Sequence, residues 1–340
     1  MTLTSSKNSE RDYCFDNIKA IMIILMVFGH AIEEFGYYGI TGGIWTYIYS
    51  FHMPVFVFVS GYFSKNIDKV VANGVKDLLI PYIIFDALFA FCRYDFKITS
   101  INIFVPDYAY WYIFSLFMWR LFIKSMSKIK YIFIISVIVG LGCGFYHSFN
   151  HFLSASRTIC FFPFFILGYF FSSSDIQKLK ENKKPFFIIL FALSGIITIA
   201  LKYADIIPAR MYLFDASYSS FGIENIKGVL FRVIIYITAF ISILCFVNLI
   251  PNKQCFLSTI GSRTIIIYLL SSFPLKAFFS IYGKYFSLPT NWLVQIIVSI
   301  GLTIVIIAIT GNSLVLKIYK QMIEKLASLF LIKETTDNNT

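Results

Sequence analysis

The chain has 340 residues, of which 58% are hydrophobic and 14% are charged, and its mean hydropathy is +0.75. A soluble domain of this length cannot bury so much apolar surface, so lipid is expected to surround much of the chain. The formal charge of +11 comes from basic residues scattered between apolar runs, which argues against a nucleic-acid partner.

The apolar residues fall in runs of roughly 16 to 22, the length at which a helix crosses about 30 Å of hydrocarbon. Runs of this kind predict helices and not the alternating strands of an outer-membrane barrel. We therefore predict an all-α integral membrane protein, a bundle of about ten transmembrane helices. The expected spans cover residues 18–36, 43–63, 77–93, 108–123, 131–147, 154–171, 186–203, 229–250, 263–282 and 292–311.

Basic residues are concentrated in alternate connecting segments, which predicts that both termini are cytoplasmic. The abundance of Phe, Ile and Lys indicates an AT-rich bacterial source, so we expect the chain in a bacterial plasma membrane. The N-terminal stretch is polar and has no small-residue cleavage site after the first apolar run, so we expect no removable signal peptide. After the last span, apolar residues recur at helical spacing with lysines between them, typical of an interfacial amphipathic helix. The predicted division is a cytoplasmic N-terminal segment (1–17), a ten-helix membrane domain (18–311) and a cytoplasmic amphipathic tail (312–340).

Ionisable residues gather in the first span. Asp16 and Lys19 lie at its inner mouth, and His30 follows eleven residues after Lys19. Charged groups inside hydrocarbon are costly, so those that remain are functional candidates. Eleven residues correspond to about three turns and about 16 Å, so Lys19 and His30 share a face without touching. A ligand longer than about 15 Å that enters from the cytoplasm could contact both.

Glu33 follows His30 at a spacing that lets its carboxylate accept the imidazole N–H and fix the tautomer. Glu34, the next residue, has a similar spacing. The alternative is that both glutamates lie in the outer headgroup region, where the helix ends.

His52, in the second span, is expected at a depth similar to that of His30, because the two antiparallel spans are joined by a short loop. A histidine pair would supply a general base and a second donor. Alternatively, His52 only makes an interhelical hydrogen bond.

Three arginines also lie near the ends of spans. Arg157 and Arg232 are placed to meet an oxyanion or an anionic acceptor, and Arg120 is placed to meet CoA phosphates together with Lys19. The alternative is that each arginine extends to lipid headgroups. Asp86, within the third span, is expected to pair with one of these cations. The six cysteines form no CxxC pair, so neither a disulfide framework nor a metal site is predicted.

Several blocks together resemble acyltransferase family 3, the membrane O-acyltransferases, and especially its fucose 4-O-acetylase-like branch. The Lys19-to-His30 spacing resembles the signature of the family's first helix. Four further blocks follow in the family's order: FHMPVFVFVSGYF (51–63), WYIFSLFMWRL (111–121), SRTICFFPFFILGYFF (156–171) and GSRTIIIYLLS (261–271). Ser271 departs from the family, where relatives often have a histidine.

The resemblance implies that acetyl-CoA donates an acetyl group to a hydroxyl of a cell-envelope or capsular carbohydrate, or of a lipid-linked glycan. It implies His30 as the catalytic histidine, Lys19 as its basic partner toward CoA, and Arg157 as a further site arginine. We predict His30, His52, Glu33 and Arg157 as catalytic residues, with Lys19, Asp16 and Arg120 binding the donor. The histidine could act as a general base or carry the acyl group transiently. The alternative function is a multi-span exporter or flippase of lipid-linked oligosaccharide or another small molecule.

Overall fold

The computed structural model describes residues 12–93, 96–97, 99, 101–146 and 152–331, and over these the chain is helical and contains no strand. His147 and His151, expected in a short loop, lie outside the described residues, as do most of the N-terminal segment and the end of the tail. The long helices are α1 (Tyr13–Glu33), α2 (Gly39–Tyr62), α4 (Ile80–Arg93), α5 (Trp111–Met126), α6 (Ile132–Gly142), α7 (Ala155–Phe170), α9 (Lys184–Tyr203), α10 (Asn225–Leu249), α12 (Thr264–Tyr285), α13 (Trp292–Thr310) and α14 (Ser313–Phe330).

Shorter elements connect these helices. Three are short α-helices: α3 (Ile67–Ala72), α8 (Ser173–Lys180) and α11 (Phe256–Gly261). A π-helical turn, η1 (Val75–Leu79), leads directly into α4. Single 3-10 turns occur at η3 (Cys143–Phe145), η5 (Phe152–Ser154), η6 (Ala209–Leu213) and η7 (Ser219–Phe221).

Each predicted span coincides with a helix among α1 to α13, so the prediction of an all-α chain is confirmed for the described residues. Six of the helices, namely α1, α7, α9, α10, α12 and α13, are long and apolar enough to cross a membrane. The helices α4, α5 and α6 are shorter, with 14, 16 and 11 residues. Length and composition of the described helices are thus consistent with a multi-pass membrane protein, and the ten-span topology stays a prediction.

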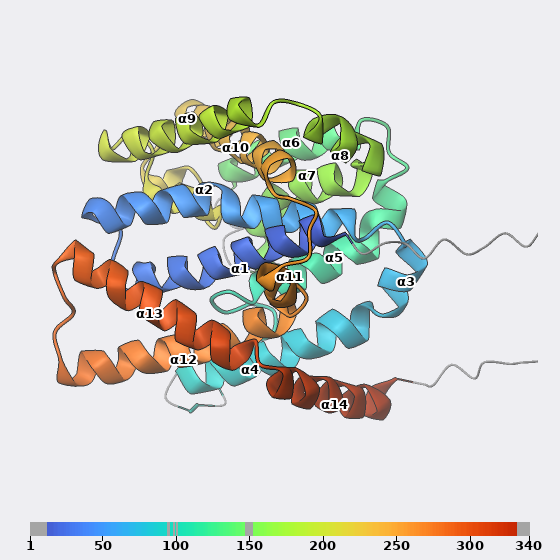
Figure 1. The fold of residues 1–340 in the computed structure, drawn as a ribbon, viewed down its shortest axis with the longest axis vertical. Helices are drawn as coiled ribbons and strands as arrows, with labels where there is room; N and C mark the ends of the chain where they lie inside the picture. Colours follow the sequence, from blue (N-terminus) through green and yellow to red (C-terminus); the bar gives the residue numbers. More distant parts are fainter. Residues whose placement is uncertain (1–11, 94–95, 98, 100, 147–151, 332–340) are drawn as a thin grey trace, which may run out of the picture.

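The helix α1 lies at the centre of the bundle, between α2 and α13 in the ribbon view (Figure 1). Phe15, Ile18 and Ile23 of α1 have no exposed surface. By contrast, α9 and α13 lie at the periphery and expose large apolar side chains such as Ile196 and Ile304, each 63% exposed. Exposed apolar helix faces of this extent match a surface that contacts lipid. The ionisable residues of α1 are therefore held in the most protected part of the fold.

Two glycines let α2 and α7 cross in close contact. A Cβ atom at Gly61 would lie 2.0 Å from the carbonyl oxygen of Phe165, and one at Gly168 would lie 1.9 Å from that of Phe58. Small residues allow membrane helices to approach at backbone distance. Both glycines precede a tyrosine in the motif blocks from residues 51–63 and 156–171, so these blocks meet directly in space.

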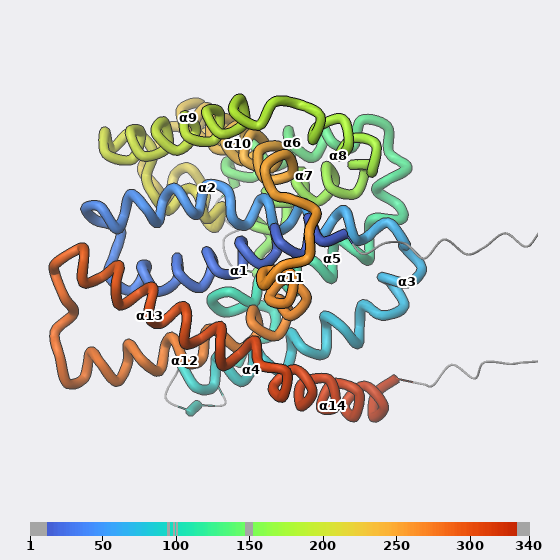
Figure 2. Tube along the Cα trace, viewed as in Figure 1, coloured from blue at the N-terminus to red at the C-terminus, as the bar shows by residue number. Residues whose placement is uncertain are grey.

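The tail helix α14 packs against the bundle and does not lie apart from it. Tyr319 and Ile323 are buried, and the ring of Tyr319 lies 6.2 Å from that of Phe85 in α4. The start of α1 and the helix α14 lie toward the same end of the bundle, as the trace shows (Figure 2). The tail helix thereby contributes to a cavity at that end, described below.

Candidate active site

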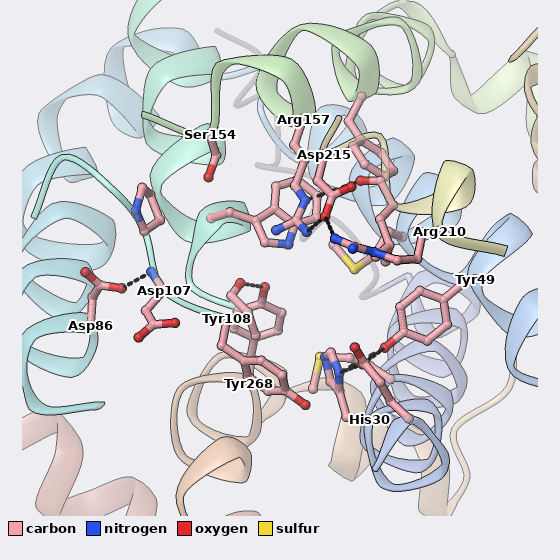
Figure 3. Close-up of a pocket in the computed structure, with 18 of the residues that line it drawn as sticks. His30, Tyr49, Asp86, Asp107, Tyr108, Ser154, Arg157, Arg210, Asp215 and Tyr268 are labelled. Carbon is pink, nitrogen blue, oxygen red and sulfur yellow. Dashed lines mark hydrogen bonds and ion pairs between the residues drawn. The ribbon is translucent and has the colours of Figure 1, made fainter. Parts of the chain in front are cut away.

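A cavity of about 730 Å³ opens around His30, and we call it the His30 cavity. Its walls come from α1, α2, α4, α5, α7 and α12 and from the segments 102–109 and 210–215. In the close-up, His30 and Tyr49 lie on one side, Arg157, Arg210 and Asp215 on a second, and Asp86 with Asp107 on a third (Figure 3). The four residues predicted as catalytic all line it: His30, Glu33, His52 and Arg157.

The imidazole of His30 is held on one edge. Its Nδ1 lies 3.1 Å from Glu33 Oε2 and 2.9 Å from the hydroxyl of Tyr49, which is also 3.1 Å from the same carboxylate oxygen. The charge of Glu33 favours a proton on Nδ1 of His30, which leaves a lone pair on Nε2. Among the described residues, no hydrogen bond to Nε2 is found, so this nitrogen remains for a substrate.

The carboxylate of Glu33 is fixed from a third direction by Tyr37, whose hydroxyl donates to Oε1 at 3.0 Å. Tyr37 lies in the short connection between α1 and α2, where burial and then the nearby Glu33 charge raise its pKa, so its hydroxyl stays protonated. The side chain of Glu33 is 23% exposed. The structure therefore brings Glu33 into contact with the histidine.

His52 lines the same cavity from α2 and is 2% exposed. Its Nδ1 donates to the carbonyl of Ile48 at 2.9 Å, which turns Nε2 away from the helix backbone. The ring of Tyr49 lies against both histidines, with centroid distances of 6.0 Å to His30 and 4.6 Å to His52. The Tyr49 ring therefore contacts both His30 and His52.

Arg157 projects from α7 toward the loop that follows α9. Its guanidinium donates to the Asp215 carboxylate at 3.2 Å and lies over the ring of Trp111 at 5.3 Å. Arg210 reaches the same Oδ2 atom of Asp215 at 3.4 Å. The Asp215 carboxylate therefore lies between two arginines on this wall.

Asp86 does not pair with a cation, contrary to the prediction. Its Oδ1 accepts a hydrogen bond from the backbone N–H of Asp107 at 2.7 Å, and no ion pair to Asp86 occurs in the described part of the chain. Asp107 instead pairs with Arg93 through Oδ1. A carboxylate that accepts a backbone N–H can anchor a loop, and here Asp86 fixes the segment that precedes α5.

A second cavity of about 540 Å³ lies at the end of the bundle where α1 begins, and we call it the Lys19 cavity. Lys19 and Arg120, both predicted to bind the donor, line it. Asp16 pairs with Lys19 at 2.9 Å, and Arg120 donates to Ser64 at 3.1 Å. The lining includes four cations, Lys19, Lys76, Arg120 and Lys320, against two carboxylates, Asp77 and Glu324. This excess of positive charge suits phosphate groups.

Asp16 lines neither cavity and pairs with Lys19, whereas the other predicted site residues line one of the two cavities. One side chain lines both. Tyr268 of α12 borders the His30 cavity and the Lys19 cavity, and it is 2% exposed. Its hydroxyl donates to the carbonyl of Ala109, and its ring lies 5.3 Å from that of Tyr112. Tyrosines are frequent in this sequence, and nothing in the pattern distinguished Tyr268, Tyr49 or Tyr108 beforehand.

Arg232 lines neither cavity. It is 1% exposed, and its guanidinium donates to the carbonyl of Gly140 at 3.0 Å and lies over the ring of Tyr218 at 4.7 Å. Arg232 therefore holds α6 to α10 and neither extends to headgroups nor enters the site. Within the described residues, no group of three His, Cys, Asp or Glu side chains is arranged to hold a metal ion.

Comparison with known proteins shows which family the chain belongs to. The model of the acyltransferase domain of acyltransferase family 3 matches residues 12–311. The nodulation protein NolL of Sinorhizobium fredii is 28% identical over 211 residues, 55% of this chain and 56% of the relative. The NolL protein of Mesorhizobium japonicum is 36% identical over 84 residues, 22% of each chain. The chain thus matches between about a fifth and just over half the length of these curated relatives. No solved structure matches. The chain belongs to acyltransferase family 3.

Proposed function

We propose that this enzyme moves an acetyl group from acetyl-CoA to a hydroxyl of a cell-envelope or capsular carbohydrate, free or lipid-linked, in a bacterial plasma membrane. The observation that carries the proposal is the division of α1 between two cavities. Lys19 lines the cavity rich in cations, and His30 lines the cavity rich in polar groups. The proposed topology has ten spans with both termini in the cytoplasm, so the Lys19 cavity faces the pool of acetyl-CoA.

Lys19 and Arg120 would hold the phosphates of the donor, with Asp16 orienting Lys19. The two ends of this arrangement are about 16 Å apart along α1, so an extended donor arm could carry its thioester toward His30. A thioester is already activated, and the protein needs a base, a polar environment for the developing oxyanion, and protection from water. Burial of α1 in the bundle supports that protection.

His30 would act as the general base through Nε2, with Glu33 stabilising the imidazolium that forms. Nε2 takes the proton of the acceptor hydroxyl as its oxygen attacks the thioester carbonyl carbon. The tetrahedral intermediate then expels CoA thiolate, which recovers the proton from His30. Alternatively, Nε2 attacks the thioester carbon first and expels CoA thiolate. The acceptor oxygen then attacks the acyl carbon, its proton passes to the thiolate, and Nε2 is released with its lone pair. His52 and Arg157 are proposed to border the reacting groups, since both line the cavity.

The test is the ester content of the cell's surface polysaccharide, measured by proton NMR of O-acetyl methyl signals. Cells would carry the wild-type gene, the His30→Ala variant or a deletion. We expect the signal to disappear in both the deletion and the variant, with the variant still present in the membrane. An unchanged signal in the deletion would contradict the proposal. Loss of exported polymer, in place of loss of ester, would favour an exporter or flippase.

A further inference from the structure

Three polar atoms in the wall of the His30 cavity lack a partner within the described structure. They are Asp107 Oδ2, the hydroxyl of Tyr108 and Asp215 Oδ1, and each is buried. A buried polar group without a hydrogen bond is destabilising, so native proteins rarely leave one unsatisfied. Three such atoms around one cavity indicate a ligand that supplies their hydrogen bonds.

The two carboxylates share one arrangement. Asp107 gives Oδ1 to Arg93, and Asp215 gives Oδ2 to both Arg157 and Arg210. The arginines hold each carboxylate in place by one oxygen and leave the other oxygen without a partner. An ionised carboxylate only accepts hydrogen bonds, so the ligand must bring O–H or N–H donors to these two positions.

The ring of Tyr108, which carries the third atom, lies beside His30. Its ring centroid lies 4.6 Å from that of His30, and the ammonium of Lys276 lies 4.5 Å from the ring on the same residue. The backbone of Tyr108 has φ of +46°, an uncommon conformation for a tyrosine. The loop thus holds the Tyr108 ring next to the proposed general base at some backbone cost.

The charge of the cavity limits which acceptor fits. Four carboxylates line it, from Glu33, Asp86, Asp107 and Asp215, against three guanidinium groups, from Arg93, Arg157 and Arg210. Each guanidinium is already in an ion pair with Asp107 or Asp215. A buried anion would therefore meet carboxylates and no guanidinium group without an ion pair.

We propose that Asp107, Tyr108 and Asp215 form an acceptor subsite for an uncharged sugar, whose hydroxyls donate to the two aspartates and bond to Tyr108 beside His30. The inference rests on the proposed function and specifies its acceptor: a neutral sugar unit and not a uronic or other acidic one. The same hydrogen bonds select a hydroxyl-rich substrate, because an analogue lacking one hydroxyl leaves a buried acceptor unpaired.

The sharpest test compares two neighbouring tyrosines. Tyr108→Phe removes a hydroxyl that has no partner in the described structure, whereas Tyr110→Phe removes one that donates to the carbonyl of Leu269 at 2.8 Å. We expect Tyr108→Phe to keep or raise the thermal stability of the purified chain and to lower acetyl transfer to the cell's own glycan roughly 10-fold. Tyr110→Phe, which lines neither cavity, should lower stability and leave the KM for acceptor unchanged.

The aspartates are tested by Asp107→Asn and Asp215→Asn, with Asp205→Asn as the matched control in an exposed part of the same loop as Asp215. Asparagine can still accept from arginine but presents an NH₂ group at the second position. We expect each cavity variant to lose transfer roughly 10–100-fold, the range for a lost bond to a charged group, with acetyl-CoA binding unchanged. Two-dimensional NMR of the acetylated glycan should locate the ester on a neutral residue.

The outcomes separate this inference from the proposed function. If wild-type and His30→Ala cells have the same ester content, the proposed function fails first. If the wild-type ester depends on His30 but Tyr108→Phe and both aspartate variants keep wild-type transfer, the subsite is wrong. An ester found on a uronic acid or another anionic residue would also overturn it. If the aspartate variants do not reach the membrane, the tyrosine pair decides alone.

Discussion

The hydroxyl of Tyr268 donates to the carbonyl of Ala109, and this contact ties α12 to the loop that borders the His30 cavity. The same side chain also borders the Lys19 cavity, so its ring lies beside the path that the donor arm would take from one cavity to the other. We therefore expect Tyr268→Ala to widen this path and admit water to the thioester. Hydrolysis of acetyl-CoA without acceptor should rise about tenfold, equivalent to about 1.4 kcal/mol of barrier.

The control for this prediction is Tyr268→Phe, which keeps the ring and removes only the bond to Ala109. Its hydrolysis rate should stay near that of the wild type. Release of free CoA, measured with a thiol reagent on the purified chain, distinguishes the variants. Equal rates in wild type and Tyr268→Ala would mean that the ring is no barrier.

Glu33 and Glu34 offer a matched pair for the catalytic assignment. Glu33 contacts His30, whereas Glu34 pairs with Lys276 of α12. Glu33→Gln removes the charge that stabilises the imidazolium, and we expect the transfer rate to fall roughly 10²–10⁴-fold, the range for a positioned acid or base. Glu34→Gln should change the rate much less. Comparable losses in both variants would show that the effect is general destabilisation of the end of α1.

Lys19 is expected to act on donor binding more than on the chemical step. Lys19→Ala removes one cation of the Lys19 cavity, so the KM for acetyl-CoA should rise roughly 10–100-fold, as for one lost bond to a charged group. The KM for the acceptor should not change. Lys19→Arg keeps the charge and should recover most of the affinity, and added salt should weaken donor binding in the wild type more than in Lys19→Ala. A normal donor KM in Lys19→Ala would contradict the assignment.

The sequence was most informative where ionisable residues lie within apolar runs. His30, Lys19 and Arg157 stood out because charged groups are costly inside apolar runs, and the structure places each of them in a cavity. The spacing of Glu33 from His30 also predicted a contact that the structure contains. These predictions depended only on the spacing of residues within one helix or on their depth in the membrane.

The residues that sequence reasoning missed come together from distant segments. Asp107 and Asp215 lie 108 positions apart, and their place in one cavity depends on how two loops fold over α1 and α7. The sequence predicted that Asp86 pairs with a cation, but its carboxylate instead accepts a hydrogen bond from a backbone N–H of the neighbouring loop. Loop conformation and backbone hydrogen bonds leave no periodic signal, so composition and spacing could not predict these contacts.

The close crossing of α2 and α7 predicts that a glycine-to-alanine substitution changes stability differently at Gly61 and at Gly301. At Gly61 an added methyl group would lie 2.0 Å from a carbonyl oxygen, a distance that the backbones cannot accept without moving apart. We expect Gly61→Ala to lower the free energy of unfolding by about 1–3 kcal/mol or more, the cost of overpacking. Gly301 of α13 has nothing within 4 Å of its Cβ position, so Gly301→Ala should be neutral or stabilise by up to about 1 kcal/mol. Thermal unfolding of the two purified variants in the same detergent measures the difference. Equal stability would mean that α2 and α7 are free to separate, and the contact between the two motif blocks would then not hold the cavity wall in place.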